Sequence, residues 1–269
     1  MNVLSLFDGM SCGFMALKKS GFNIQSYYAS EIDKFAVKES KANFPGINHL
    51  GDITKWQTWS IDWSSINLLI GGSPCQGFST AGKGLGFNDK RSNLFFIYVD
   101  ILNHLKKVNP NVKFMLENVR MKKQWLDVIT EHLGVEPVFI DSKLVSAQSR
   151  KRFYWCNWHV SQPKDKGILL KDVIEHGVVD QDKSYCIDAN YWKGGSLKSY
   201  FEKHRRQLVF FNKEKIKFRK LTVVECCRLQ GVPDDYFKVS SNTQAYKMLG
   251  NGWQVDTVAH IFGALKCDK

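Results

Sequence analysis

One cysteine stands in a setting that suits nucleophilic chemistry. Cys75 follows Pro74 and comes directly after a short apolar run that predicts a buried strand. The loop that it opens contains several glycines, at Gly77, Gly82, Gly84 and Gly86. Such a loop could close over a substrate and exclude water. Two alternatives stay open, because a free cysteine is more often a small buried hydrophobic residue and an ordinary surface loop can be equally rich in glycine.

A carboxyl group and a basic face are expected beside this cysteine. Glu117 follows the predicted strand Lys113–Leu116, which places it on the same edge of the sheet as the cysteine. Gln148, Arg150 and Arg152 alternate in an extended segment and therefore share one face. That face could hold a carboxylate or a phosphate by bidentate pairing. The simpler alternatives are a solvated glutamate and a solvated basic strand edge.

The turn after the first predicted strand suits a nucleoside ligand. Gly9 and Gly13 let the backbone approach a ligand at a helix N-terminus, and the second predicted strand ends in Glu31, whose carboxylate suits a ribose diol. The dinucleotide fingerprint G-x-G-x-x-G is absent, which favours a smaller adenosine ligand. Asp52, at a third strand end, could accept the adenine amino group. Alone, these residues also fit a tight turn followed by a solvated glutamate.

The elements that would position these groups alternate along the first half of the chain. Short apolar runs predict buried strands, and the longer amphipathic segments between them predict crossover helices. The runs are Val3–Phe7, Ser26–Ser30, Asn67–Ile70 and Lys113–Leu116, with further strands expected at Phe139–Val145 and Arg152–Trp158. This pattern predicts an α/β fold, a doubly wound and mostly parallel sheet whose ligand site lies at the carboxyl ends of the strands.

The pattern changes after residue 158. The stretch 159–220 is polar and irregular, and within it Pro163–Lys220 contains 14 Lys or Arg against 8 Asp or Glu. We therefore expect a catalytic and cofactor-binding domain at residues 1–158 and a small basic region at 159–220. A return segment, 221–269, would complete the catalytic domain.

Helix signals reappear in the return segment. Thr222 and Glu225 predict a capping box at a helix N-terminus, and Gly231 predicts the end of that helix. A last helix is expected over Val255–Leu265. Regular structure should therefore resume directly after the basic region.

The composition is that of a globular protein with a polyanionic partner. The 269 residues include 43% hydrophobic and 24% charged side chains, which excludes a disordered or fibrous chain. Lys and Arg give a net charge of +12, which favours a nucleic acid. No apolar run reaches the ~18 residues of a membrane span, and no secretion signal is seen. The seven cysteines form no C-x-x-C pair, so a reduced, intracellular protein without a disulfide framework or metal site is expected.

Together these motifs resemble the cytosine-5 DNA methyltransferases. The resemblance covers residues 1 to about 158 and 221 to about 266, with the motifs in the order and spacing of that family. It implies an S-adenosylmethionine-dependent methyltransferase fold with a small inserted target-recognition domain. The residues that it assigns to S-adenosylmethionine are Phe7, Asp8, Gly9, Gly13, Glu31, Ile32, Asp52, Ile53, Ser73, Pro74, Leu94, Asn251 and Trp253.

The resemblance also implies a covalent mechanism. Cys75 would attack carbon 6 of cytosine as a thiolate, because carbon 5 is too poor a nucleophile until the ring gains electrons. Glu117 would protonate or hydrogen-bond ring nitrogen 3. Arg152 would bind the base carbonyl oxygen and orient Glu117, whereas Arg150 would meet a phosphate near the flipped nucleotide.

The implied substrate is a cytosine in duplex DNA, rotated out of the base stack. The expected DNA contacts from the loop after the cysteine are Gln76, Ser79, Lys83 and Arg91. Those from the basic region are Tyr191, Trp192, Lys193, Gly194, Lys203, Arg205 and Arg206. A solvated basic face is the alternative for residues 203–206.

Some segments indicate a subgroup. Ala29–Glu31, Val145–Ala147 and Asn251–Trp253 resemble the catalytic domains of animal de novo methyltransferases, whereas Pro74–Lys83 resembles bacterial restriction-modification enzymes. Since no reading domain is attached, we expect a bacterial or phage origin and a cytoplasmic location. A cognate restriction endonuclease is a candidate partner, and a monomer is favoured. Gly252 replaces the serine common after that asparagine, a change expected to be sterically harmless.

Two rival functions are weighed against this one. A related branch acts on transfer RNA and carries a Cys-Phe-Thr signature, which this sequence lacks. A silent regulatory relative would be expected to have lost Cys75 or Glu117, and both are present. Neither a metal nor a membrane is expected to take part.

Overall fold

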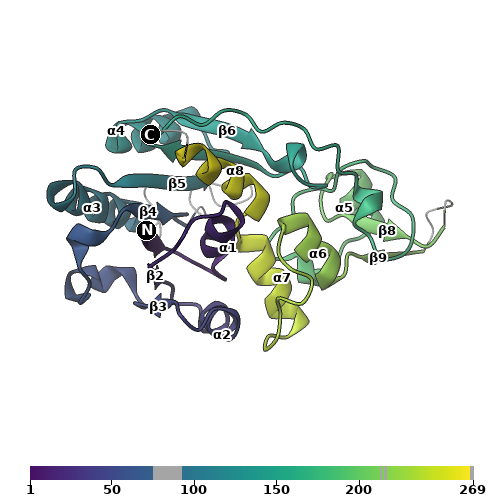
Figure 1. Ribbon diagram of the computed structural model, residues 1–269. Coiled ribbons are helices and arrows are strands. Elements are labelled where there is room, and N and C mark those ends of the chain that lie inside the picture. The colour runs from purple at the N-terminus through teal and green to yellow at the C-terminus, as the bar shows by residue number, and fades with distance from the viewer. Residues whose placement is uncertain (75–92, 213, 215–216, 267–269) are drawn as a thin grey trace.

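A seven-stranded sheet forms the centre of the molecule in the computed structural model, which describes residues 1–74, 93–212, 214 and 217–266 (Figure 1). The strand order is β3-β2-β1-β4-β5-β7-β6. The strands are β1 (Asn2–Leu6), β2 (Ser26–Ser30), β3 (Asn48–His49), β4 (Leu68–Gly71), β5 (Lys113–Val119), β6 (Pro137–Asp141) and β7 (Lys151–Cys156). The first five are parallel, and β7 runs antiparallel to β5 and β6. The predicted doubly wound, mostly parallel α/β fold is confirmed.

Helices cover both faces of this sheet, so the strands are apolar on both sides. Val3 and Ile70 belong to the core cluster on the face with α1 (Cys12–Lys19), α2 (Lys34–Asn43) and α8 (Val255–Leu265). Their neighbours Leu4 and Leu69 belong to the cluster on the opposite face, with α3 (Asn93–Val108) and α4 (Lys123–Leu133). Successive side chains of each strand thus pack into two separate hydrophobic cores, one on each face of the sheet.

Two predicted strand ends are wrong by three or more residues, and both errors have a local cause. The strand β5 continues to Val119, three residues beyond Leu116, because Val119 still pairs with Arg152 of β7. The strand β6 ends at Asp141, whose side chain accepts a hydrogen bond from the backbone N–H of Lys143 and so starts a 3-10 turn. The first correction places Glu117 inside a strand rather than after one.

The helices of the return segment follow the sequence signals. The helix α6 (Val223–Gln230) begins with the Thr222–Glu225 capping box and ends at Gly231, whose φ of +68° is left-handed. The helix α7 (Asn242–Asn251) follows, and α8 has the predicted bounds Val255–Leu265. The capping predictions are therefore confirmed.

Residues 159–220 form an extension at one end of the sheet, on the right in Figure 1. It contains α5 (Leu197–Phe201) and the hairpin-like pair β8 (Leu208–Phe210) and β9 (Phe218–Lys220), with a small core around Tyr200. Other side chains of this stretch, such as Ile187, join the main core. The extension is thus packed onto the body that contains the sheet.

Two negative findings concern the residues that the structure describes. None of their helices is both long and apolar enough to span a membrane. Within the same part of the chain, no three His, Cys, Asp or Glu side chains gather where they could bind a metal ion.

Candidate active site

A cavity of about 260 Å³ lies at the carboxyl ends of β1, β2, β4 and β5. It is lined by Phe7, Asp8, Gly9, Met10, Cys12, Glu31, Asp33, Ala36, Gly72, Ser73, Pro74, Glu117, Val119, Arg150, Arg152, Met248, Gly250, Asn251, Gly252 and Trp253. Most residues that the sequence assigns to the cofactor are in this lining, as are the three described residues assigned to catalysis. The prediction that parallel strand ends would gather these side chains is confirmed.

The turn between β1 and α1 is strained and is held by a buried carboxylate. Phe7, Gly9 and Ser11 all have φ near +60°, a conformation that costs a non-glycine residue about 1 to 2 kcal/mol. The Asp8 carboxylate accepts hydrogen bonds from the Ser11 hydroxyl at 2.6 Å and the Tyr27 hydroxyl at 2.7 Å. Strained conformations persist only where the surrounding contacts hold them. These two hydrogen bonds supply such contacts for the turn that lines the cavity.

Burial sets the charge state of this carboxylate. Loss of solvent raises the pKa of Asp8 from 3.8 to about 6, although the hydrogen bonds from Ser11 and Tyr27 oppose the rise. Asp8 therefore gains a proton on mild acidification. Cys12, the described cysteine in the lining, has its pKa raised to about 12 by burial and stays a thiol at neutral pH. Because thiolate is the reactive form, burial makes Cys12 a poor nucleophile.

Glu31 fixes the end of β2 against this turn. One oxygen of its carboxylate accepts the backbone N–H of Gly9 at 2.8 Å. The other accepts the backbone N–H groups of Ile32 and Asp33 at 2.8 and 2.7 Å. Ile32 is 76% exposed and is not part of the cavity lining.

Besides Ile32, four residues expected to bind the cofactor lie outside the cavity lining. Gly13 makes room for its neighbours, since a Cβ there would lie 2.6 Å from Ile70. Asp52 caps a 3-10 helix by accepting the backbone N–H of Thr54 at 2.9 Å, and Ile53 is buried in the core. Leu94 of α3 packs against the same core. Cofactor contacts for these four remain predictions.

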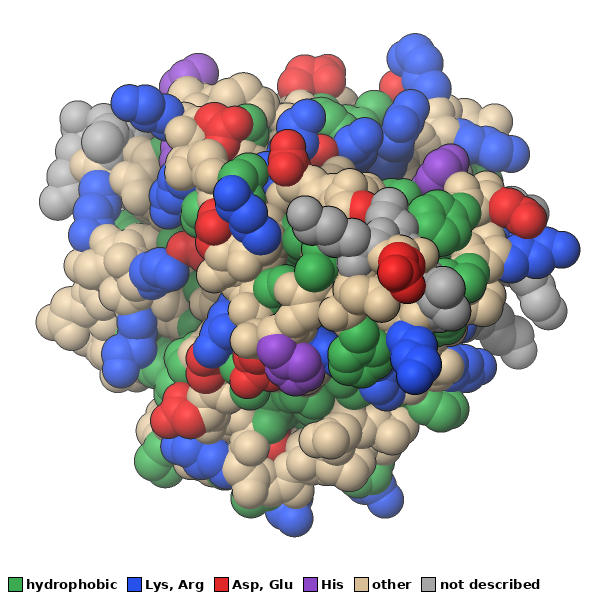
Figure 2. All heavy atoms as spheres, turned by 90° about the vertical axis from the view of Figure 1, so that its right-hand side faces the viewer, with side chains coloured by type: hydrophobic (Ala, Val, Ile, Leu, Met, Phe, Trp, Pro, Cys, Tyr) green, Lys and Arg blue, Asp and Glu red, His purple; other side chains and the backbone are tan. Residues whose placement is uncertain are grey.

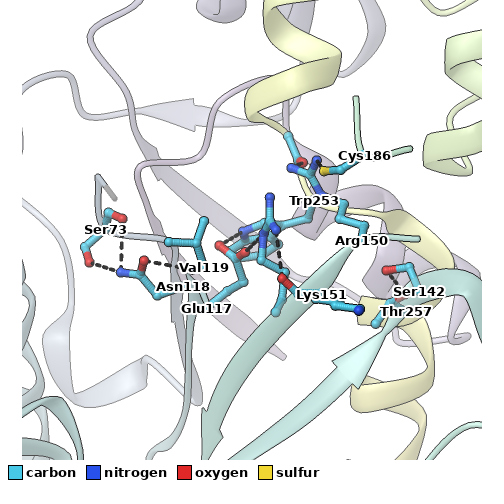
Figure 3. Close-up of polar contacts among 12 residues, drawn as sticks. Ser73, Glu117, Asn118, Val119, Ser142, Arg150, Lys151, Cys186, Trp253 and Thr257 are labelled. Carbon is cyan, nitrogen blue, oxygen red and sulfur yellow. Dashed lines mark hydrogen bonds and ion pairs between the residues drawn. The ribbon is translucent and has the colours of Figure 1, made fainter. Parts of the chain in front are cut away.

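Glu117 is held from two sides at the cavity wall (Figure 3). Arg152 places Nε 2.8 Å from its Oε1, and the Trp253 indole donates from Nε1 to its Oε2 at 3.1 Å. The Arg152 and Glu117 side chains are only 14% and 12% exposed. The antiparallel pairing of β5 with β7 brings the two strands together here. The predicted contact of Arg152 with Glu117 is confirmed.

Asn118 is a site residue whose role the sequence did not reveal. Its side chain is buried and donates to the Ser73 hydroxyl at 3.1 Å and, more weakly, to the Ser73 carbonyl at 3.4 Å. It therefore ties β5 to the segment that leads into Pro74. A polar residue in the middle of an otherwise buried strand is the available signal, because such groups are buried only with partners.

Arg150 is placed differently from the expectation. It is 3% exposed, and Nη1 donates to the Ile187 carbonyl at 3.0 Å. Nη2 donates to the carbonyls of Gly250 and Gly252 at 3.0 and 2.7 Å. Instead of the predicted phosphate, Arg150 binds main-chain carbonyls of both the extension and the return segment, and so links the two. The physical reason is that three main-chain carbonyls converge there and need a donor.

Gly252 lies in a closely packed turn. A Cβ at this position would lie 3.0 Å from the Cys12 sulfur and 3.0 Å from the Met248 carbonyl oxygen. A side chain here would therefore require its neighbours to give way. The expectation that glycine is sterically harmless at this position is consistent with this close packing.

Tyr191 is another correction. It is fully buried, its hydroxyl donates to the Gln207 carbonyl, and it accepts the backbone N–H of Leu221 at 2.9 Å. Both polar capacities of the hydroxyl are thus used inside the protein, which leaves nothing to present to DNA. Arg206 is partly engaged in the same way, because Nη1 donates to the Gly194 carbonyl at 2.8 Å.

The other expected DNA contacts of the extension are on the surface. Trp192 is 39% exposed, and Lys193 lies over its ring at 5.4 Å from the centroid. Lys203 and Arg205 are exposed. Figure 2, which faces this end of the molecule, shows Lys and Arg side chains spread among hydrophobic ones. The expected residues Cys75, Gln76, Ser79, Lys83 and Arg91 lie outside the described residues.

Two solved structures share this fold. A methyltransferase of Entamoeba histolytica, EhMeth, superposes with a TM-score of 0.75 at 18% identity, over 100% of this chain and 98% of that one. A triple variant of Spodoptera frugiperda DNMT2 superposes with a TM-score of 0.70 at 20% identity, over 98% and 99%. At this identity the likeness concerns the fold.

Sequence relatives give the family. The type II methyltransferase M1.ScrFI of Lactococcus lactis subsp. cremoris is 31% identical over 314 aligned positions, 96% of this chain and 76% of that protein. The type II methyltransferase M.HpaII of Haemophilus parainfluenzae is 29% identical, over 95% and 86%. The family described as C-5 cytosine-specific DNA methylase matches residues 1–165 and 160–267. The chain belongs to this family, whose members transfer a methyl group from S-adenosylmethionine to carbon 5 of cytosine in DNA.

Proposed function

We propose that the cavity is the place of this reaction, and that it holds S-adenosylmethionine beside a cytosine flipped out of duplex DNA. The observation that supports this most is the position of Glu117. It is fixed between Arg152 and Trp253 on the wall that continues into Ser73 and Pro74. The expected nucleophile, Cys75, is the next residue of the chain. An acid and a guanidinium are therefore held beside the segment that precedes Cys75 in the sequence.

The other side of the cavity suits the cofactor. Asp8, Glu31 and Asp33 line it, and their carboxylates favour a ligand that carries a sulfonium and an ammonium group. The strained turn exposes backbone at Gly9, where a ligand can approach closely. The cofactor supplies an electrophilic methyl group. The exposed Ile32 offers an apolar surface that a nucleobase could cover.

The chemistry follows from the groups at the opposite wall. The Cys75 thiolate forms a bond to carbon 6, and the electron pair of the C5–C6 double bond moves into the ring. Glu117 donates its proton to nitrogen 3, so the adduct is a neutral enamine. Arg152 binds the carbonyl oxygen at carbon 2 and keeps Glu117 in place. Carbon 5, now electron-rich, takes the methyl group, and the electron pair of the broken methyl–sulfur bond stays on the sulfur that carried it. Nitrogen 3 gives its proton back to the Glu117 carboxylate.

The product is released by elimination. A base or water takes the proton from carbon 5, and the electrons of that C–H bond restore the C5–C6 double bond. The C6–S bond breaks at the same time, and its electron pair leaves with Cys75 as thiolate. The nucleophile is thereby regenerated without an oxidant or reductant.

The basic extension, residues 159–220, is proposed as the target-recognition domain. Trp192, Lys193, Lys203 and Arg205 are exposed there, which suits contacts to phosphates and base edges. The domain limits 1–158, 159–220 and 221–269 are part of this proposal. We further propose a monomer that acts in the bacterial cytoplasm, or in that of a phage-infected cell. The type II methyltransferases among the relatives favour pairing with a restriction endonuclease.

Bisulfite sequencing of unmethylated duplex DNA after incubation with the protein and S-adenosylmethionine tests the proposal. Protection of cytosines within one short motif is expected. Cys75→Ala should abolish protection, a loss of at least about 10⁴-fold, while S-adenosylmethionine still binds in calorimetry. Substantial residual turnover of this variant would remove Cys75 from the mechanism, and methyl transfer to RNA alone would replace the DNA substrate.

A further inference from the structure

The Trp253 indole lies where the cofactor half of the cavity meets the catalytic half. It lines the cavity, and its Nε1 donates to Glu117 Oε2 at 3.1 Å (Figure 3). We infer that Trp253 is a positioning residue for Glu117, a second donor that works together with Arg152. The inference rests on the proposed function, because it concerns the carboxyl group that serves cytosine nitrogen 3.

Two glycines create the space that the indole occupies. A Cβ on Gly72 would lie 2.8 Å from Trp253 Nε1 and 2.9 Å from Glu117 Oε2. A Cβ on Gly13 would lie 3.3 Å from Trp253 Cζ3. The indole is therefore packed between the cofactor turn and the end of β4, and Gly72 is closest at the hydrogen bond itself. This packing explains a requirement for glycine at residue 72 that no backbone angle demands, since its φ is not positive.

The backbone next to the indole is anchored as firmly as the ring. The carbonyl of Gly252 accepts Arg150 Nη2 at 2.7 Å, and the buried Gln254 side chain caps α8 by accepting the backbone N–H of Thr257 at 2.7 Å. A donor on a fixed backbone can hold a partner at one angle. Trp253 is thus suited to positioning rather than to a loose surface contact.

The two donors contact different oxygens of the Glu117 carboxyl group. Arg152 supplies positive charge and takes Oε1, whereas the indole is neutral and takes Oε2. Each oxygen still has a second lone pair. Because each oxygen has its own donor, rotation of the carboxyl group is restricted. Proton transfer requires the acid within about 2.6 to 3.2 Å of nitrogen 3, so rotation of this group would misplace the proton.

Removal of the indole N–H is the direct test. Trp253→Phe keeps an aromatic ring in the cavity and deletes the donor. Trp158→Phe is the matched control, because Trp158 Nε1 also donates one hydrogen bond of 3.1 Å, to the Ile261 carbonyl, away from the cavity. The readouts are kcat, the Kd of S-adenosylmethionine, and release of tritium from [5-³H]cytosine DNA without cofactor. That release needs attack at carbon 6 and protonation at carbon 5, but no methyl group.

For Trp253→Phe we expect kcat and tritium release to fall together by about 10- to 100-fold, as for a misplaced reacting group, while Kd changes less than about 3-fold. Trp158→Phe should leave all three within about 2-fold of wild type. Unchanged kcat and tritium release in Trp253→Phe, or a loss confined to Kd, would overturn the positioning role. If wild type neither methylates DNA nor releases tritium, the proposed function fails instead.

Gly72→Ala is a second, independent test that does not depend on how Trp253→Phe folds. The added Cβ would separate Nε1 from Oε2, so the same joint loss of kcat and tritium release is expected. A Gly72→Ala enzyme with wild-type tritium release would contradict the inference.

Discussion

The cavity wall and the basic extension hold their polar side chains in opposite ways. In the wall, Asp8, Glu31 and Glu117 each have two or more short hydrogen bonds or ion pairs to neighbouring elements. In the extension, Lys203 and Arg205 are exposed. Chemistry at one atom needs groups that are fixed before the substrate arrives, whereas backbone phosphates can be met by mobile charges.

Arg150 links the two regions and gives the largest expected stability effect. Arg150→Met would leave the carbonyls of Ile187, Gly250 and Gly252 without their buried donor. We expect a loss of roughly 3 kcal/mol in the free energy of unfolding, measured by urea denaturation, with weaker cofactor and DNA binding.

The control is Arg228→Met, which removes an arginine whose ion pair with Asp234 is exposed. It should cost about 1 kcal/mol or less. If Arg150→Met lowers the free energy of unfolding no more than this control does, the hydrogen bonds of Arg150 are not what stabilises this region. The predicted contact of Arg150 with a DNA phosphate would then be favoured.

The pH dependence of the free energy of unfolding tests whether burial in the cavity wall raises the pKa of Asp8. Burial raises the pKa of Asp8 from 3.8 to about 6, so between these values the folded protein holds a proton that the unfolded chain has lost. The protonated form of Asp8 makes its full contribution to the free energy of unfolding below pH 3.8. This contribution is lost as the pH rises through about 6. Asp8→Asn should therefore be more stable than wild type at pH 7.5, by up to about 3 kcal/mol.

Asp33 supplies a control of opposite sign. Although partial burial opposes it, the hydrogen bond from Lys247 lowers the pKa of Asp33. Its contribution is present above the unfolded pKa and lost as the pH falls, so Asp33→Asn should lose stability at pH 7.5. Denaturation curves from pH 5 to 8 measure both variants. An Asp8→Asn protein with the pH profile of wild type would show that Asp8 does not carry this charge effect.

The smallest effect is expected in the extension. The double variant Lys203→Ala, Arg205→Ala should weaken DNA binding at all sequences alike and lower the slope of log K against log salt by about 2. Lys107→Ala, at the end of α3 on the far face of the sheet, should leave the slope unchanged. Fluorescence anisotropy at several salt concentrations measures it. Equal slopes for all three proteins would place the DNA on another surface.

The parts of the site that follow strand ends could be predicted, and those set by long-range contacts could not. Glu31 and Glu117 lie where the alternation of apolar runs puts them, because parallel strands share one carboxyl edge. Arg150 and Tyr191 looked available in the sequence. They are buried because segments 100 and 30 residues away close over them, at Gly250 and Leu221. No local pattern contains that information.

The covalent step is the central claim, and DNA with 5-fluorocytosine at the target position tests it most directly. Fluorine at carbon 5 cannot leave as a proton does, so the adduct persists after methyl transfer. Denaturing mass spectrometry should find protein, DNA strand and one methyl group joined, with the bond at the peptide that contains Cys75. A wild-type enzyme that methylates ordinary cytosine yet forms no such adduct, or forms it at another cysteine, would contradict the account.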